Sequence, residues 1–277
     1  MSDRGGADFK AFEATGWTAQ AGTYGELSGQ ITSRFAEALL DAAAVRHGAR
    51  VLDVATGPGY VAERAAARGG VPVGIDIADG MLAVARERHP ELEFRHGDAE
   101  QLPFDGASFD AVVGNFVVNH LPQPERAISE AHRVLAKGGR CAFSVWGGLE
   151  GMPVMALIGH AIDAVGVEGD EEPAGIPPGP DPYRFADAIE FRLLLEREGF
   201  SEVVVEPAEL VHHVADAEAL WNGFLGGSVR GATFVRALPR AVQSRIREAL
   251  DGLVEPYRVG DDLELPVVAM VASGRRT

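Results

Sequence analysis

Short apolar runs alternate with segments of helical period through the first half of the chain. Val51 to Ala55 and Val71 to Ile77 have the length and β-branched content of strands, and residues of helical period follow each of them. Leu92 to Arg95, Ser108 to Val118 and Arg140 to Trp146 continue the series. Strands that alternate with helices form a parallel sheet covered by helices on both faces. The pattern therefore predicts an α/β fold, a Rossmann-like, doubly wound sheet.

The first of these strands breaks into a glycine turn. Residues 51–59 read Val-Leu-Asp-Val-Ala-Thr-Gly-Pro-Gly, and good helix formers follow from Tyr60 to Arg68. Gly57 and Gly59 permit positive φ and remove side chains where a ligand could approach. The N-terminus of the next helix would offer unpaired N–H groups to an anion. An ordinary strand-to-helix turn would also account for the glycines.

Glycine spacing alone does not choose between two kinds of cofactor. Gly57-x-Gly59-x-x-Ala62 fits the dinucleotide-binding pattern, and Asp76 lies about 20 residues further on, as that pattern requires. Asp53 favours the other interpretation. A pyrophosphate gains nothing from a carboxylate at the strand end, whereas a ligand with an amino group and a sulfonium would.

Residues 50–146 resemble the class I S-adenosylmethionine-dependent methyltransferases, in the branch that acts on small molecules. The resemblance rests on the glycine turn, Asp76, Met81, the run Gly97-Asp98-Ala99-Glu100 and the Lys137-Gly138-Gly139 turn before the fifth strand. It implies a seven-stranded sheet that is mostly parallel with an antiparallel last strand, plus a helical lid or cap. It also implies S-adenosylmethionine as cofactor and S-adenosylhomocysteine as product.

The resemblance assigns roles to individual residues. Asp76 can accept hydrogen bonds from both ribose hydroxyls, although a helix N-cap is an alternative for which Asp79 is better placed. Met81 would lie against the adenine, Asp98 and Ala99 would bind its edge, and the Asn115 backbone would face the methionine end. The expected cofactor-binding residues are Tyr24, Asp53, Ala55, Thr56, Gly57, Gly59, Asp76, Ile77, Met81, Asp98, Ala99, Glu100, Asn115 and Phe116.

His120 is the candidate catalytic residue. It follows the fourth strand, and histidine is the usual proton acceptor near neutral pH. A general base that takes the acceptor proton and a side chain that only positions the acceptor are both open. His212 and His213 have no carboxylate or cysteine at ligand spacing, so no metal site is predicted.

A single domain is expected over residues 1–277, because no linker separates two cores. Residues 1–30 are polar and glycine-rich, and we expect an arm that closes over the cofactor. The cofactor-binding core follows at 31–146, and a lid insertion occupies 147–183. The acidic, proline-rich run from Glu168 to Asp181 reads as a mobile loop. Residues 184–277 would complete the sheet and add cap helices.

Composition limits the function. The net charge of −16 repels nucleic acid and anionic membranes, so we expect a small-molecule acceptor and a protein that is a monomer or a homodimer. The lone Cys141 cannot form an internal disulfide, which fits the cytoplasm. The predicted function is methyl transfer to an O, N or C atom of a small molecule such as a natural product. The alternatives are a cofactor-binding protein that catalyses a cyclisation or elimination, and a non-enzymatic binding subunit.

Overall fold

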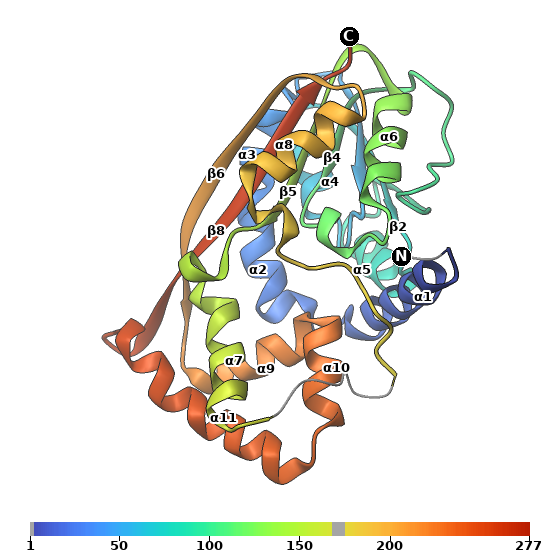
Figure 1. Cartoon of the computed structure of the whole chain (residues 1–277). Coiled ribbons are helices and arrows are strands. Elements are labelled where there is room, and N and C mark those ends of the chain that lie inside the picture. Colours follow the sequence, from blue (N-terminus) through green and yellow to red (C-terminus); the bar gives the residue numbers. More distant parts are fainter. Residues whose placement is uncertain (1–2, 168–174) are drawn as a thin grey trace.

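A twisted sheet forms the centre of the computed structural model, which describes residues 3–167 and 175–277 (Figure 1). The strand order is β3-β2-β1-β4-β5-β8-β6, and the short β7 pairs with β8. The strands are β1 (Arg50–Val54), β2 (Val71–Asp76), β3 (Glu93–His96), β4 (Phe109–Gly114), β5 (Leu135–Trp146), β6 (Ser201–Val214), β7 (Arg258–Val259) and β8 (Asp262–Arg275). Strands β1 to β5 pair in parallel, and β8 is antiparallel to both β5 and β6. The predicted mostly parallel sheet with an antiparallel last strand is confirmed.

The side chains of successive residues in the central strands point to opposite faces of the sheet. Val51, Ala111 and Val113 join the core beneath α3 (Ala36–Ala42) and α4 (Tyr60–Ala67). Leu52 and Val112 join the core on the other face, beneath α6 (Pro124–Val134) and α8 (Ala188–Arg197). Because side chains alternate along a strand, a strand covered on both faces is apolar throughout. The continuous apolar runs in the sequence have this cause.

The first 30 residues, for which we expected an arm, are mostly helical. Residues Asp3–Gln20 form one helix, α1, and shorter pieces follow: η1 (Tyr24–Glu26), α2 (Ser28–Thr32) and η2 (Ser33–Phe35). Phe9 is buried, and a Cβ on Gly80 would come within 2.4 Å of the Thr18 backbone. Helix α1 therefore lies directly against the start of α5 (Asp79–Arg88).

A second group of helices lies beyond the end of the sheet opposite the C-terminus (Figure 1). These are α7 (Pro153–Ala164), α9 (Ala217–Gly227), α10 (Val229–Ala237) and α11 (Arg240–Val254), which we call the cap. They share a hydrophobic core with the outer ends of β6 and β8. The short helices η3 (Val118–His120), η4 (Leu149–Gly151), η5 (Arg184–Ala186) and η6 (Glu255–Tyr257) connect the larger elements. Of the expected mobile loop, residues 168–174 lie outside the described residues, and 175–181 form no helix or strand.

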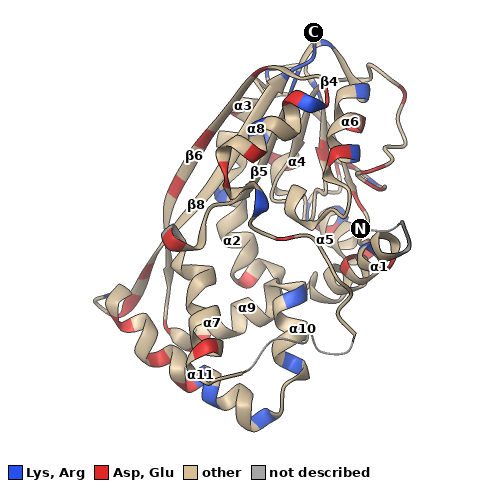
Figure 2. Cartoon of the chain, viewed as in Figure 1, with Lys and Arg blue, Asp and Glu red and all other residues tan. Residues whose placement is uncertain are grey.

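Several arginines on α10 and α11 stand out among the charges of the cap (Figure 2). Arg236 and Arg245 donate to backbone carbonyls of Leu225 and Val165, and Arg247 pairs with Asp251. Arg236 and Arg245 thus join different segments of the cap, whereas the Arg247–Asp251 pair lies within α11. Among the described helices, none has the length and apolar character that crossing a membrane requires.

Candidate functional site

A cavity of about 520 Å³ opens at the carboxyl ends of β1, β2 and β4. Helix α1, η1 and the cap helices enclose it from the side opposite the sheet. Ligands of open α/β sheets bind at this edge, where the loops after the parallel strands meet. The cavity is therefore the candidate site.

Eleven of the predicted site residues line this cavity. They come from η1, the end of β2, the loops after β1, β2, β3 and β4, the start of α5, and η3: Tyr24, Ala55, Gly57, Asp76, Ile77, Met81, Asp98, Ala99, Asn115, Phe116 and His120. The other four, Asp53, Thr56, Gly59 and Glu100, lie behind the cavity wall and not on it.

The two glycines of the turn have different functions. Gly57 has φ +53° and lines the cavity, and a Cβ there would meet no protein atom within 4 Å. A side chain at this position would therefore project into free space beside the wall. Gly59 has φ +85° and precedes α4, but a Cβ there would lie 2.9 Å from Cζ of Phe94. Gly59 allows close packing and does not face the cavity.

Asp53 does not line the cavity, although we had expected it to face a cationic ligand there. It supports the glycine turn from the side that faces away from the cavity. Its Oδ2 accepts from Thr56 Oγ1 at 2.6 Å and from the Ala62 N–H at 3.1 Å, so it fastens both the turn and the first turn of α4. Burial raises the pKa of Asp53 from 3.8 to about 7, more than these hydrogen bonds lower it. Thr56 is likewise buried and acts as the partner of Asp53.

Asp76 lies on the wall itself. Its Oδ2 accepts from the Gly57 N–H at 2.9 Å and its Oδ1 from the Ala78 N–H at 2.8 Å. Burial raises its pKa, while these N–H groups favour the ionised form. Each carboxylate oxygen can accept a further bond, so the side chain keeps acceptor capacity toward the cavity. Asp79, the alternative N-cap, is exposed and does not line the cavity.

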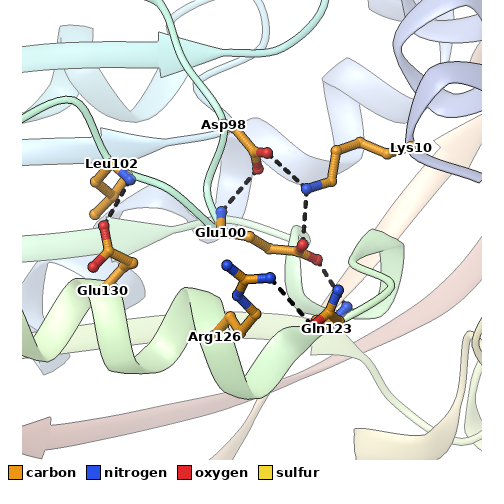
Figure 3. A network of polar contacts seen from close by, with 7 residues as sticks. All are labelled: Lys10, Asp98, Glu100, Leu102, Gln123, Arg126 and Glu130. Carbon is orange, nitrogen blue, oxygen red and sulfur yellow. Dashed lines mark hydrogen bonds and ion pairs between the residues drawn. The ribbon is translucent and has the colours of Figure 1, made fainter. Parts of the chain in front are cut away.

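Helix α1 is fastened over the loop after β3 by Lys10 (Figure 3). Lys10 Nζ lies 2.6 Å from Asp98 Oδ2 and 2.7 Å from Glu100 Oε2. Burial alone would lower the pKa of Lys10, but the bonds to both carboxylates outweigh it and the pKa is raised. Glu100 also accepts from the Gln123 N–H at 2.8 Å. Glu100 thus joins α1 to the loop before α6. Of the two carboxylates that bind Lys10, only that of Asp98 lies on the cavity wall.

The turn after β4 is strained and supported from below. Phe116 has φ +54°, a region that costs energy for a bulky side chain. Its N–H donates to Ser144 Oγ at 2.9 Å, and that hydroxyl donates to Asn115 Oδ1 at 2.7 Å. The Asn115 amide in turn donates to the Thr32 carbonyl at 2.9 Å. This chain of bonds presents the Phe116 ring to the cavity, where it contacts Trp146 at a tilted angle of 37° with ring centroids 4.1 Å apart.

Helix α1 also contributes an acidic partner for His120 that the sequence did not reveal. Glu13 Oε2 lies 3.0 Å from His120 Nδ1 and accepts from Trp17 Nε1 at 2.8 Å. Glu13 and Trp17 are one helical turn apart, a spacing that would have suggested a shared face had this helix been predicted. All three side chains line the cavity.

The part of the cavity beneath the cap is mostly apolar, although Ser228 and Arg230 also line it. Its wall comes from α7, α9, α10 and the residues before η5, and includes Ile158, Tyr183, Phe224 and Phe234. Polar groups are thus concentrated near the strand ends, and apolar groups beneath the cap. A ligand with one polar and one apolar portion fits this division.

Comparison with known proteins agrees with this geometry. Residues 52–143 match the family of the methyltransferase domain. Over these residues the chain is similar to methyltransferase domains. A demethylmenaquinone methyltransferase of Renibacterium salmoninarum is 40% identical over 109 residues, which are 39% of this chain and 46% of the relative. A ubiquinone/menaquinone biosynthesis C-methyltransferase of Brucella anthropi is 34% identical over 182 residues, 57% of this chain and 65% of the relative. The chain thus spans less than half of the first relative's length.

Solved structures share the fold of the methyltransferase domain at low identity. A putative methyltransferase from Bacillus halodurans has a TM-score of 0.54 at 22% identity, covering 87% of this chain and 98% of the other. A [4+2]-cyclase has a TM-score of 0.52 at 22% identity, covering 88% of this chain and 81% of the other. Both likenesses concern the fold alone.

The buried carboxylate behind the glycine turn predicts a pH dependence of stability. A carboxyl whose pKa is raised on folding stabilises the protein fully below its unfolded value, 3.8, and loses this contribution as the pH rises through about 7. Thermal unfolding of Asp53→Asn should therefore show a gain in melting temperature over the parent that grows between pH 4 and pH 8.

Asp110→Asn is the matched control for that experiment. Asp110 pairs with Arg50, which lowers its pKa, so its contribution is present above 3.8 and is lost as the pH falls. This variant should lose stability relative to the parent toward neutral pH. A melting-temperature difference for Asp53→Asn that does not change with pH would contradict the assignment.

The Lys10 contacts predict how firmly α1 is held. Lys10→Met keeps most of the side-chain stem but leaves Glu100 buried without its cation, a loss of about 1–3 kcal/mol. Amide hydrogen exchange over residues 3–20 should become faster, by roughly 10-fold if the loss is 1.4 kcal/mol. Lys137→Met, at an exposed position in β5, should leave this exchange unchanged. Equal protection of α1 in both variants would show that the helix is held by its apolar contacts alone.

Proposed function

We propose that this protein transfers a methyl group from S-adenosylmethionine to a small-molecule acceptor, releasing S-adenosylhomocysteine. The observation that carries the proposal is the pairing of Asp76 with Gly57 on the cavity wall. The Asp76 carboxylate can accept further hydrogen bonds from a ligand. It lies beside Gly57, where a side chain would project into the cavity and meet no protein atom. The family match over residues 52–143 and the two curated relatives support the same activity.

The donor set of the cavity fits this cofactor. Asp76 would accept from the ribose hydroxyls, and Asp98 and the Ala99 N–H would bind the adenine edge. Met81 would cover the ring face, and the Asn115–Phe116 turn would face the methionine end. Tyr24, Ala55 and Ile77 would complete the site, while Asp53, Thr56, Gly59 and Glu100 would support it from behind. When bound, the cofactor supplies an activated methyl group on a sulfonium, and the protein has mainly to align the acceptor with it.

A dinucleotide is the weaker candidate. In the dinucleotide pattern the second glycine lets the backbone approach the pyrophosphate. Here Gly59 packs against Phe94 and does not line the cavity. Asp76 does not separate the two candidates, because a carboxylate at this position binds the ribose in either case.

The acceptor would occupy the apolar portion beneath the cap. This portion suits a molecule with an apolar, ring-containing body, and the relatives' names connect their activity with quinone biosynthesis. We also propose one domain for the whole chain, with α1 and the cap covering the site, and a cytoplasmic protein without nucleic-acid partners. A cyclisation on the same fold is the alternative, since the fold alone does not determine the reaction.

Cofactor binding provides the first test. Asp76→Ala should weaken the binding of S-adenosylhomocysteine by about 1.5–3 kcal/mol, because hydrogen bonds to a charged acceptor are lost. Isothermal titration calorimetry measures the change, and Asp79→Ala, an exposed aspartate three residues further on, is the matched control that should bind like the parent. Unchanged affinity in Asp76→Ala would disprove the ribose assignment. Tighter binding of NAD than of S-adenosylhomocysteine would favour the dinucleotide.

Methyl transfer itself is tested with S-adenosylmethionine labelled in the methyl group. Incorporation of label into an acceptor, with release of S-adenosylhomocysteine, is the expected outcome. An acceptor that rearranges while the label stays on the cofactor would establish the cyclisation instead.

A further inference from the structure

Three polar side chains from α1 and η3 lie together at one part of the cavity wall. Glu13 and Asn119 are each 4% exposed, and His120 completes the group. Glu13 Oε1 and both amide atoms of Asn119 have no hydrogen-bond partner within the described part of the chain. Polar atoms buried at such depth without a partner destabilise the fold. Their position on a cavity wall, next to a histidine, suggests that a ligand group is their partner.

The hydrogen bonds determine the tautomer of His120. Trp17 Nε1 can only donate, so the Glu13 carboxylate accepts from it, and the same oxygen accepts from His120 Nδ1. The network therefore places the neutral imidazole proton on Nδ1 and leaves Nε2 as a hydrogen-bond acceptor. Trp17 also contacts the imidazole edge-on, with ring centroids 5.4 Å apart, and restricts its rotation. The side chain is thus oriented as a proton acceptor.

We infer that Glu13 is a positioning residue that holds His120 as the general base, and that Asn119 binds the same acceptor hydroxyl. This inference rests on the proposed methyl transfer. The acceptor's O–H bond breaks and its proton goes to His120 Nε2. The oxygen's electron pair forms the bond to the methyl carbon, and the carbon–sulfur bond breaks with its pair left on sulfur. The imidazolium then returns the proton to solvent, and Glu13 stabilises its charge while it lasts.

The surrounding charges favour this assignment. The other ionisable side chains on the cavity wall are Lys10, Tyr24, Asp76, Asp98, Tyr183 and Arg230. Lys10 pairs with Asp98 and Glu100, and Arg230 donates to the Pro180 carbonyl. Within the described part of the chain, Glu13 is therefore the only anionic partner of His120. The substrate class that this part of the cavity wall selects is an apolar, ring-containing molecule with a hydroxyl whose proton must leave.

The tautomer gives a test that needs no substrate. In protein labelled with ¹⁵N-histidine, long-range ¹H–¹⁵N spectra identify which nitrogen carries the proton, and His120→Gln assigns the signal. The parent should show the proton of the neutral imidazole on Nδ1 and a bare Nε2. In Glu13→Gln the proton should be shared between Nδ1 and Nε2, because an amide can donate as well as accept and no longer fixes the tautomer. Asp8→Asn removes a charge from the exposed face of the same helix and should leave the tautomer unchanged.

Kinetics separate positioning from a merely structural role. In Glu13→Gln the rate should fall about 10²-fold, the lower end of what a positioned acid–base group supplies. Affinity for S-adenosylhomocysteine should stay within about a factor of two, because Glu13 acts through His120. An Nε2-protonated His120 in the parent, or a tautomer that Glu13→Gln leaves unchanged, would overturn the inference. A bare Nε2 in a protein that transfers no methyl group would instead refute the proposed function alone.

Asn119 is tested in the free protein. Asn119→Leu replaces unpaired buried polar atoms with an apolar side chain of similar size, so the melting temperature should rise or stay the same. Activity should nevertheless fall, since the hydroxyl loses a partner. A lower melting temperature would show that the amide has a structural partner, and would remove Asn119 from the acceptor site.

Discussion

Two buried carboxylates at the ends of neighbouring parallel strands hold the turn on which the candidate site depends. Asp53 binds Thr56 and the start of α4, while Asp76 binds the Gly57 and Ala78 N–H groups. Side chains from β1 and β2 thus bind the turn from two sides and hold its backbone at the cavity in one conformation. The cost is the burial of two acidic groups, which raises the pKa of each. A ligand bearing positive charge would offset part of that cost, so the arrangement that positions the turn also favours a sulfonium over an anion.

The remaining walls are built by segments that cover this turn. Lys10 fastens α1 to the loop after β3, and Ser144 supports the strained Phe116 turn after β4. Each contact joins a loop at a strand end to an element from another part of the chain. The polar portion of the cavity is therefore rigid where strands end, and the apolar portion depends on how the cap packs. This division explains how one core could accept different substrates through changes in the cap alone.

The sheet was predictable because its strands are buried on both faces and read as continuous apolar runs. The same property concealed the orientation of Asp53. In β1 every residue from Val51 onward is buried, so alternation could not tell which side chains face the cavity and which face the helices. The glycine turn was predictable as a motif, but motif spacing treats Gly57 and Gly59 alike. Only the neighbourhood of Phe94 distinguishes the glycine that packs from the glycine that faces the cavity.

Helix α1 was missed because glycines and short polar residues weaken its helical signal, and its stability comes from docking onto α5 and the cap. That omission also hid Glu13, whose partner His120 lies 107 residues later in the chain. A histidine near neutral pH is ambiguous in isolation, since the same side chain can serve as a base, a positioning group or a wall. What resolves the ambiguity is which nitrogen is occupied, and that depends on a carboxylate brought in by a distant helix. The residues proposed to bind the cofactor belong to local motifs that the sequence shows, whereas the surroundings of His120 are a property of the tertiary fold.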